Sequence, residues 1–78
     1  MTTTAIDLSV DARGLACPMP IVKTAQAMKT VTSGQLVEIL ATDAGSLKDF
    51  PAWSKSTGNP IVESGVDAGV YRFVVQRK

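Results

Sequence analysis

The chain has 78 residues, is 45% hydrophobic, and balances eight basic against seven acidic side chains for a net charge of +1. This composition predicts one small folded domain, residues 1–78, and excludes a disordered chain. The chain contains no histidine, which excludes Ser-His-Asp and Cys-His catalytic sites and His-assisted zinc binding, and its balanced charge does not favour direct nucleic-acid binding.

The first predicted elements are a strand and a helix. The aliphatic residues that alternate with polar ones, as in a half-buried strand, are Ile6, Leu8 and Val10. A loop over residues 11–14 leads to Cys17, and helical spacing begins after Pro18. The residues expected to share the apolar face of this helix are Ile21, Val22, Ala25 and Met28. Gly34 marks the end of the helical region.

A second strand and a second helix follow. Residues 36–42 alternate in polarity, and the side chains expected on the buried face of this strand are Val37, Ile39 and Ala41. The Ser46–Asp49 segment resembles a capping box that opens a helix. We expect Pro51 to divide this region into a short turn and a main helix, and Gly58 to end it. The residues expected on its apolar face are Leu47, Phe50 and Trp53.

The last part of the chain predicts a β-hairpin. Residues 61–66 and 70–76 flank a three-residue turn, 67–69, which ends in glycine. Every predicted strand carries a polar face, so helices should cover only one side of the sheet. We therefore predict an α/β fold, a two-layer sandwich of order β-α-β-α-β-β with a four-stranded mixed sheet and both helices on one face.

This topology predicts which loops meet. If the first three strands run parallel, their carboxyl ends share one edge, where open α/β sheets bind ligands. Cys17, residues 43–46 and residues 67–69 follow such ends, whereas Arg77-Lys78 should lie at the opposite edge. The residues expected on the uncovered face, as a possible partner surface, are Leu36, Leu40, Val70 and Val74 beside Glu38 and Arg72.

Cys17 is the candidate reactive residue. We predict that it is the N-cap of the first helix, with Pro18 at the first helical position and Pro20 stiffening the same turn. A helix N-terminus favours the thiolate and should lower the thiol pKa, although the two prolines remove nearby N–H donors. Arg13 and Lys48 could add positive potential. The alternative is a buried, inert cysteine.

The segment Asp11–Pro20, Asp-Ala-Arg-Gly-Leu-Ala-Cys-Pro-Met-Pro, resembles the signature of the TusA/SirA-like sulfur carrier proteins. The resemblance extends from Ile6 to the final strand and includes Asp43 and the Asp49-Phe50-Pro51 segment. It implies the β-α-β-α-β-β sandwich and a sulfurtransferase-type activity in which Cys17 carries a persulfide. The motif residues that would support Cys17 are Arg13, Gly14, Pro18 and Pro20.

The resemblance does not identify the pathway. The family member that serves tRNA thiolation has an arginine where this chain has Ala16, and an acidic residue where it has Met19. Other similar proteins serve molybdenum-cofactor supply, sulfur oxidation or selenium metabolism. The implied partners are sulfur-donor and sulfur-acceptor proteins, which could contact Met19, Asp43 and Lys48. Turn capping is an equally good explanation of Asp43, and a solvated helix face explains Lys48.

Two other functions fit the sequence, namely a nucleic-acid or regulatory binding module and a single-cysteine redox protein. We expect no cofactor and no metal site. No segment is long and apolar enough to span a membrane, and a lone thiol without a secretory signal is typical of a cytoplasmic protein. The sequence leaves the oligomeric state open.

Overall fold

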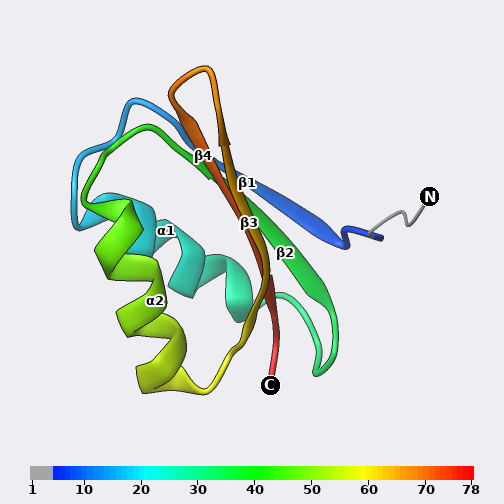
Figure 1. Cartoon of the computed structure of the whole chain (residues 1–78). Helices are drawn as coiled ribbons and strands as arrows, with labels where there is room; N and C mark the ends of the chain where they lie inside the picture. The colour runs from blue at the N-terminus through cyan, green and yellow to red at the C-terminus, as the bar shows by residue number, and fades with distance from the viewer. Residues whose placement is uncertain (1–4) are drawn as a thin grey trace.

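The structure, a computed structural model, describes residues 5–78. This part of the chain folds in the order β-α-β-α-β-β, as the sequence predicts (Figure 1). The elements are β1 (Leu8–Ala12), α1 (Met19–Met28), β2 (Leu36–Ala41), α2 (Ser46–Thr57), β3 (Ile61–Asp67) and β4 (Val70–Gln76).

The four strands form one mixed sheet in the order β1-β2-β4-β3. β1 and β2 are parallel, and β4 is antiparallel to both β2 and β3. β1, β2 and β3 therefore point the same way, and the loops that follow them meet at one edge, which we call the carboxyl edge. Both helices cover the same face, and the C-terminus lies at the far edge (Figure 1). The predicted two-layer sandwich is confirmed.

The core lies between the sheet and the two helices. Val37, Ile39 and Ala41 of β2 are fully buried, which confirms the face that the alternation predicts. From α2, the ring of Phe50 stacks on Phe73 of β4 with the ring centroids 4.6 Å apart. Each buried aliphatic or aromatic side chain contributes about 1.5–3 kcal/mol to folding. The covered face is therefore the main source of stability, and it holds both helices against the sheet.

The buried stripe of α1 differs from the predicted one. Pro20, Thr24 and Met28 are buried, whereas Val22 is 38% exposed. Residues four apart lie on one side of a helix, and a residue two positions away points to the other side. The hydroxyl of Thr24 donates to the carbonyl oxygen of Pro20 at 2.8 Å, so a polar side chain can occupy the buried stripe. The placement of Val22 on the apolar face was wrong, and that of Met28 is confirmed.

The prediction that Pro51 divides the second helical region is wrong. α2 is one continuous helix with Pro51 inside it. A proline lacks the N–H that would bond the carbonyl four residues earlier, here that of Leu47. Leu47, whose carbonyl loses this internal hydrogen bond, is itself 54% exposed. This exposure shows that the placement of Leu47 on the apolar face was wrong. The buried residues of α2 are instead Ser46 and Phe50.

The beginning of α2 also differs from the prediction, and its end agrees with it. Gly45 is the N-cap and no side chain caps the helix, so the predicted capping box of Ser46 and Asp49 does not form. Ser46 is instead buried as the first helical residue. Gly58, in the left-handed conformation, ends the helix as predicted.

The hairpin turn is shorter than predicted. β3 continues to Asp67, and the turn consists of Ala68 and Gly69, with φ values of 50° and 81°. Positive φ at both central residues is typical of a two-residue hairpin turn whose twist matches that of the strands. Near its other end, β3 has a register shift between Ile61 and Glu63.

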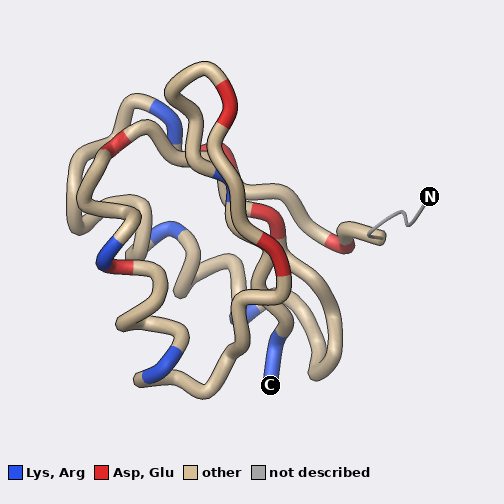
Figure 2. The backbone as a smooth tube through the Cα atoms, viewed as in Figure 1, with Lys and Arg blue, Asp and Glu red and all other residues tan. Residues whose placement is uncertain are grey.

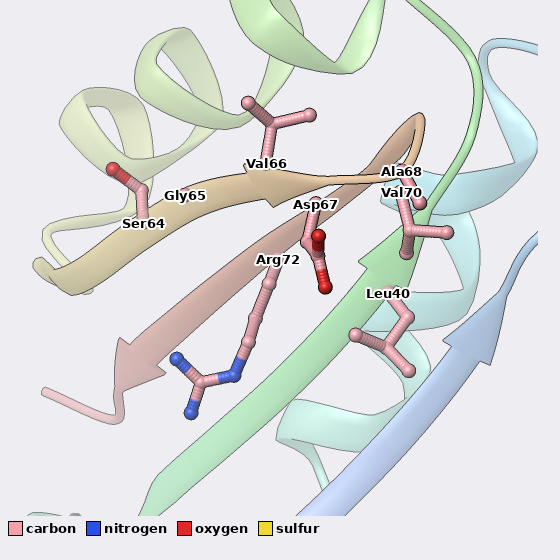
Figure 3. Close-up of a pocket in the computed structure, with 8 residues that line it drawn as sticks. All are labelled: Leu40, Ser64, Gly65, Val66, Asp67, Ala68, Val70 and Arg72. Atoms are coloured by element: carbon pink, nitrogen blue, oxygen red, sulfur yellow. The ribbon is translucent and has the colours of Figure 1, made fainter.

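The uncovered face of the sheet carries charged and aliphatic side chains. Leu40, Val70 and Arg72 project from this face around a hollow of about 490 Å³ beside Gly65 (Figure 3). Val74 lies on the same side but is fully buried, since it is in register with Glu38 on one neighbouring strand and with Glu63 on the other.

An arginine joins those two carboxylates. Arg72 donates from Nε to Glu38 at 2.6 Å and from Nη1 to Glu63 at 2.7 Å, while Ser9 donates to the other oxygen of Glu38 at 2.9 Å. We call Glu38, Arg72 and Glu63 the arginine bridge. Val74 therefore lies on the predicted face, but it is not exposed there, because the two carboxylates that the bridge joins flank it on both neighbouring strands.

Candidate functional site

The loop between β1 and α1 is fastened to the carboxyl edge before it reaches Cys17. Gly14 has φ +78°, a conformation that favours glycine, and its N–H donates to the hydroxyl of Thr42 at 2.9 Å. Leu15 donates its N–H to the carbonyl of Ala12 at 3.3 Å and packs against the core. These contacts place Cys17 at the carboxyl edge with its side chain exposed. The alternative of a buried cysteine is therefore wrong.

Cys17 lies one residue earlier than predicted relative to the helix. Pro18, not Cys17, is the N-cap of α1, and the Cys17–Pro18 peptide bond is cis. The N–H of Met19 donates to the carbonyl of Ala16 at 2.9 Å, which removes the nearest helical amide as a donor to the thiolate. The sulfur therefore lacks the helix-end stabilisation on which the predicted fall in its pKa depended.

The polar partner of Cys17 is a carboxylate from the other helix. Its Sγ donates to Oδ2 of Asp49, in the first turn of α2, at 2.7 Å. This hydrogen bond to Asp49 is the largest cause of a raised pKa of the Cys17 thiol, followed by desolvation and by the charges of Asp49 and Asp43. The predicted lowering of this pKa was wrong because two carboxylates, rather than helix amides and cations, surround the sulfur.

Sequence reasoning missed the role of Asp49. The residue fits a capping pattern, and that local interpretation concealed a contact with a residue 32 positions earlier in the chain. The available signal was topological. Cys17 and the start of the second helix were both expected at the carboxyl edge, so an acidic residue there was a candidate neighbour of the thiol.

Gly45 lets these groups approach one another. A Cβ atom at this position would lie 2.8 Å from Oδ2 of Asp43, and 3.7 Å from both Oδ2 of Asp49 and Cβ of Cys17. Its φ of −60° is ordinary helical backbone, so what this glycine provides is space for the Asp43 carboxylate rather than a special conformation. The structure thus brings Asp43 close to Cys17, as the order of the loops predicts.

The cations proposed to assist Cys17 do not act on it. Arg13 makes two hydrogen bonds to Asp11, at 2.9 and 3.0 Å, and these bonds lower the pKa of Asp11 to about 2. Lys23 donates to the carbonyl of the same aspartate at 2.8 Å. Lys48 is exposed on α2 and is not among the groups that shift the pKa of the thiol. Among residues 5–78, no ion pair includes either carboxylate beside the sulfur.

The remaining motif residues divide between core and rim. Pro20 is buried, whereas Pro18 is exposed and Met19 is 47% exposed. Lysine, arginine, aspartate and glutamate positions are interspersed along the described backbone rather than separated by sign (Figure 2). Within residues 5–78, no group of three or more aspartate, glutamate, cysteine or histidine side chains is arranged so that it could hold a metal ion. An exposed thiol on a fixed loop can undergo sulfur exchange with another macromolecule.

The fold and the site together define a small two-layer α/β domain that presents one free, exposed thiol on a loop at the carboxyl edge. The family model described as Sulfurtransferase TusA matches residues 8–77, and the chain belongs to this family.

Named relatives agree with this assignment. The chain is 46% identical over 71 residues to a putative sulfur carrier protein, YrkI, of Bacillus subtilis, covering 91% of this chain and 95% of the relative. It is 41% identical over 71 residues to the sulfur carrier protein TusA of Allochromatium vinosum, covering 91% and 93%. A role in sulfur transfer is therefore supported at the level of the family.

A solved structure agrees at the level of the fold. The crystal structure of a SirA-like protein from Desulfitobacterium hafniense superposes with a TM-score of 0.78 at 22% identity, covering 88% of this chain and 95% of that one. No helix within residues 5–78 has the length and apolar character needed to cross a membrane.

Proposed function

We propose that this protein is a sulfur carrier in which Cys17 accepts sulfane sulfur from a donor protein as a persulfide and passes it to an acceptor protein. The observation that carries the proposal is the exposure of the single cysteine, within the Cys-Pro-Met-Pro segment, on a loop fastened to the carboxyl edge. Membership of a family whose named members are sulfur carriers supports the same chemistry.

The proposed transfer is a thiol–persulfide exchange. The thiolate of Cys17 attacks the outer sulfur of the donor persulfide, a new S–S bond forms, and the donor's own S–S bond breaks. The electron pair of the broken bond stays on the donor's inner sulfur, which leaves as a thiolate. A nucleophile of the acceptor protein then attacks the outer sulfur on Cys17 and restores its thiolate. No external oxidant or reductant is required.

The residues around Cys17 fix its position and are not assigned a role in proton transfer. Pro20 is buried at the start of α1, and Gly14 ties the loop to Thr42, so Cys17 has a defined place. Arg13 contributes by ordering the loop through Asp11. Because the chain has no histidine, the donor and acceptor proteins would provide any imidazole acid or base. We place this exchange in the cytoplasm, where thiols stay reduced.

The rim around the thiol is the proposed contact surface for those partners. Pro18 and Met19 are exposed beside Cys17, and a methionine side chain adapts to different apolar surfaces. Asp43 and the exposed Lys48 flank the same edge on the other loop and helix. These side chains give a partner both apolar and charged groups to recognise without covering the sulfur.

The test is an intact-mass measurement after incubation with a sulfane-sulfur donor such as polysulfide. The wild-type protein should gain the mass of added sulfur, and a thiol reductant should reverse the gain. The Cys17→Ser variant should gain none, yet keep its circular dichroism and thermal midpoint, because serine replaces an exposed thiol of similar size. Sulfur loading that persists in this variant would refute the proposal.

The surroundings of the thiol do not favour the alternative of a single-cysteine redox protein. Redox-sensing cysteines combine exposure with a low pKa. Here the hydrogen bond to Asp49 raises the pKa of the Cys17 thiol. Slow oxidation by peroxide under conditions in which polysulfide loads the protein would separate the two functions.

A further inference from the structure

The hydrogen bond between Cys17 and Asp49 joins two segments that are far apart in the chain. The thiol is held by the β1–α1 loop, and the carboxylate by the first turn of α2, with 2.7 Å between Sγ and Oδ2. Gly45 leaves the space in which the two side chains meet. Phe50, next to Asp49, is fully buried and anchors that turn of α2 in the core. The contact therefore links two rigidly held backbone positions.

We propose that Asp49 is a positioning residue for the sulfur transfer: its Oδ2 accepts the Cys17 hydrogen and holds the sulfur in its thiol form, so that transfer begins only when this hydrogen bond opens. This inference rests on the proposed function of Cys17 as the sulfur-carrying residue. Asp49 acts through Cys17 and is not itself assigned a bond to the sulfur that is transferred.

The charges that face the sulfur support a resting thiol. Asp49 from α2 and Asp43 from the β2–α2 loop both repel a thiolate, and only the protonated sulfur can donate to a carboxylate. From the loop of Cys17 itself, Arg13 is turned to Asp11, and from α1 Lys23 bonds the Asp11 carbonyl. Lys48, beside Asp49 in sequence, is exposed and does not shift the thiol pKa. No cation near the sulfur offsets the two carboxylates in the described chain.

Opening the contact changes what the sulfur can do. The thiolate is the nucleophile, and the thiol has little reactivity toward a persulfide. When the hydrogen bond opens, the proton passes to water or to a base on the donor protein. The electron pair that it leaves on Sγ then forms the new S–S bond. A free carrier would thus react slowly with small electrophiles, and one whose hydrogen bond has opened on a partner would react faster.

The experiment measures the alkylation rate of Cys17 by iodoacetamide as a function of pH in wild-type and Asp49→Asn proteins. Asparagine keeps the shape of the side chain, removes its charge and can donate to the thiolate, so the midpoint of the profile should fall. A fall of about one pH unit makes about tenfold more thiolate at pH 7, and the weaker nucleophilicity of a less basic thiolate leaves an alkylation rate about threefold higher.

Three further variants separate positioning from general effects. Asp49→Glu should keep a midpoint closer to that of the wild type, because a carboxylate remains. Asp43→Asn should lower the midpoint by less, since Asp43 acts on the sulfur by charge alone. Asp67→Asn removes an exposed carboxylate in the hairpin and should leave the profile unchanged.

A measurement on the wild-type protein covers the case in which Asp49→Asn fails to fold. In an NMR titration, the carboxyl carbon of Asp49 should shift at the pH at which Cys17 ionises, and that pH should exceed the value of an unfolded control peptide. Superposable alkylation profiles for wild-type and Asp49→Asn, or ionisation of Cys17 at or below the peptide value, would overturn the inference. Sulfur loading of Cys17 is measured separately, so the proposed function can stand or fail independently.

Discussion

Two groups of carboxylates on this small protein have opposite surroundings. On the uncovered face, Glu38 and Glu63 lie on either side of Arg72, which bonds both. At the carboxyl edge, Asp43 and Asp49 lie beside Cys17 with no bound cation in the described residues. Each group contains two acidic side chains from different elements, and of the two only the group on the sheet face is bonded to a cation in the described residues.

The presence or absence of a bonded cation distinguishes the two groups: the carboxylates bonded to Arg72 form a structural arrangement, and those beside Cys17 form one suited to chemistry. Bonding to Arg72 lowers the pKa of Glu38, which is the response of a carboxylate held charged by a cation. Bonding to Asp49 raises the pKa of Cys17, which is the response of an acid held neutral by a carboxylate. The arginine bridge pairs its carboxylates with a cation, whereas the two carboxylates beside the thiol have no such cation in the described residues.

The largest expected effect comes from breaking the arginine bridge. Arg72→Ala leaves two carboxylates close together without their cation and uncovers Val74, so the free energy of unfolding should fall by about 1–2 kcal/mol. Urea denaturation at pH 7 measures this change. Arg13→Ala, which removes an arginine whose partner Asp11 is exposed, is the matched control and should change stability little. Equal losses in the two variants would show that the bridge is not structural.

A smaller effect should appear in the acid range. The pKa of Glu38 is lowered in the folded state, so its contribution is fully present above its unfolded pKa of about 4.3 and is lost as the pH falls through the folded value. The unfolding free energy of Glu38→Gln should therefore depend less on pH between about 5 and 2 than that of the wild type. Asp11, with its pKa of about 2, gives a residual slope in both proteins. Parallel curves would contradict the assignment of this slope to Glu38.

The smallest expected effect lies in the alkaline range and has the opposite sign. Because the pKa of Cys17 is raised on folding, the stability that it contributes is fully present below its unfolded pKa of about 8.5 and is lost as the pH rises through the folded value. The unfolding free energy of the wild type should therefore fall relative to that of Cys17→Ser from pH 7.5 to 10. A difference that stays constant over this range would show that folding does not shift the thiol pKa.

The sequence predicts the fold well where one face of an element is uniformly buried. The alternation of β2 identifies its inner residues because Val37, Ile39 and Ala41 all meet the helices. The glycine at the end of α2 identifies its terminus because few other residues adopt a left-handed conformation. In both cases the property that decides the structure is local to a short segment, so it can be recognised in a single sequence.

The sequence fails where contacts between distant residues decide the outcome. Asp49 fits a local capping pattern but bonds Cys17, and Val74 fits an exposed pattern but lies under the arginine bridge. Likewise, a buried Thr24 is compatible with α1 only because its hydroxyl reaches a backbone carbonyl of the same helix. The edge at which the site forms was predictable from topology, whereas the sign of the pKa shift depended on which side chains meet there.

The glycine at position 45 has a consequence for any attempt to redesign this protein. Its backbone is ordinary helix, so a substitution there meets no conformational barrier, but even a methyl group would meet a carboxylate oxygen at 2.8 Å. Any side chain at position 45 would therefore displace the Asp43 carboxylate beside the thiol, although Gly45 itself contributes no functional group. Variation of the residues around the thiol should keep Gly45 constant, because the spacing among them is set by the volume that this residue does not fill.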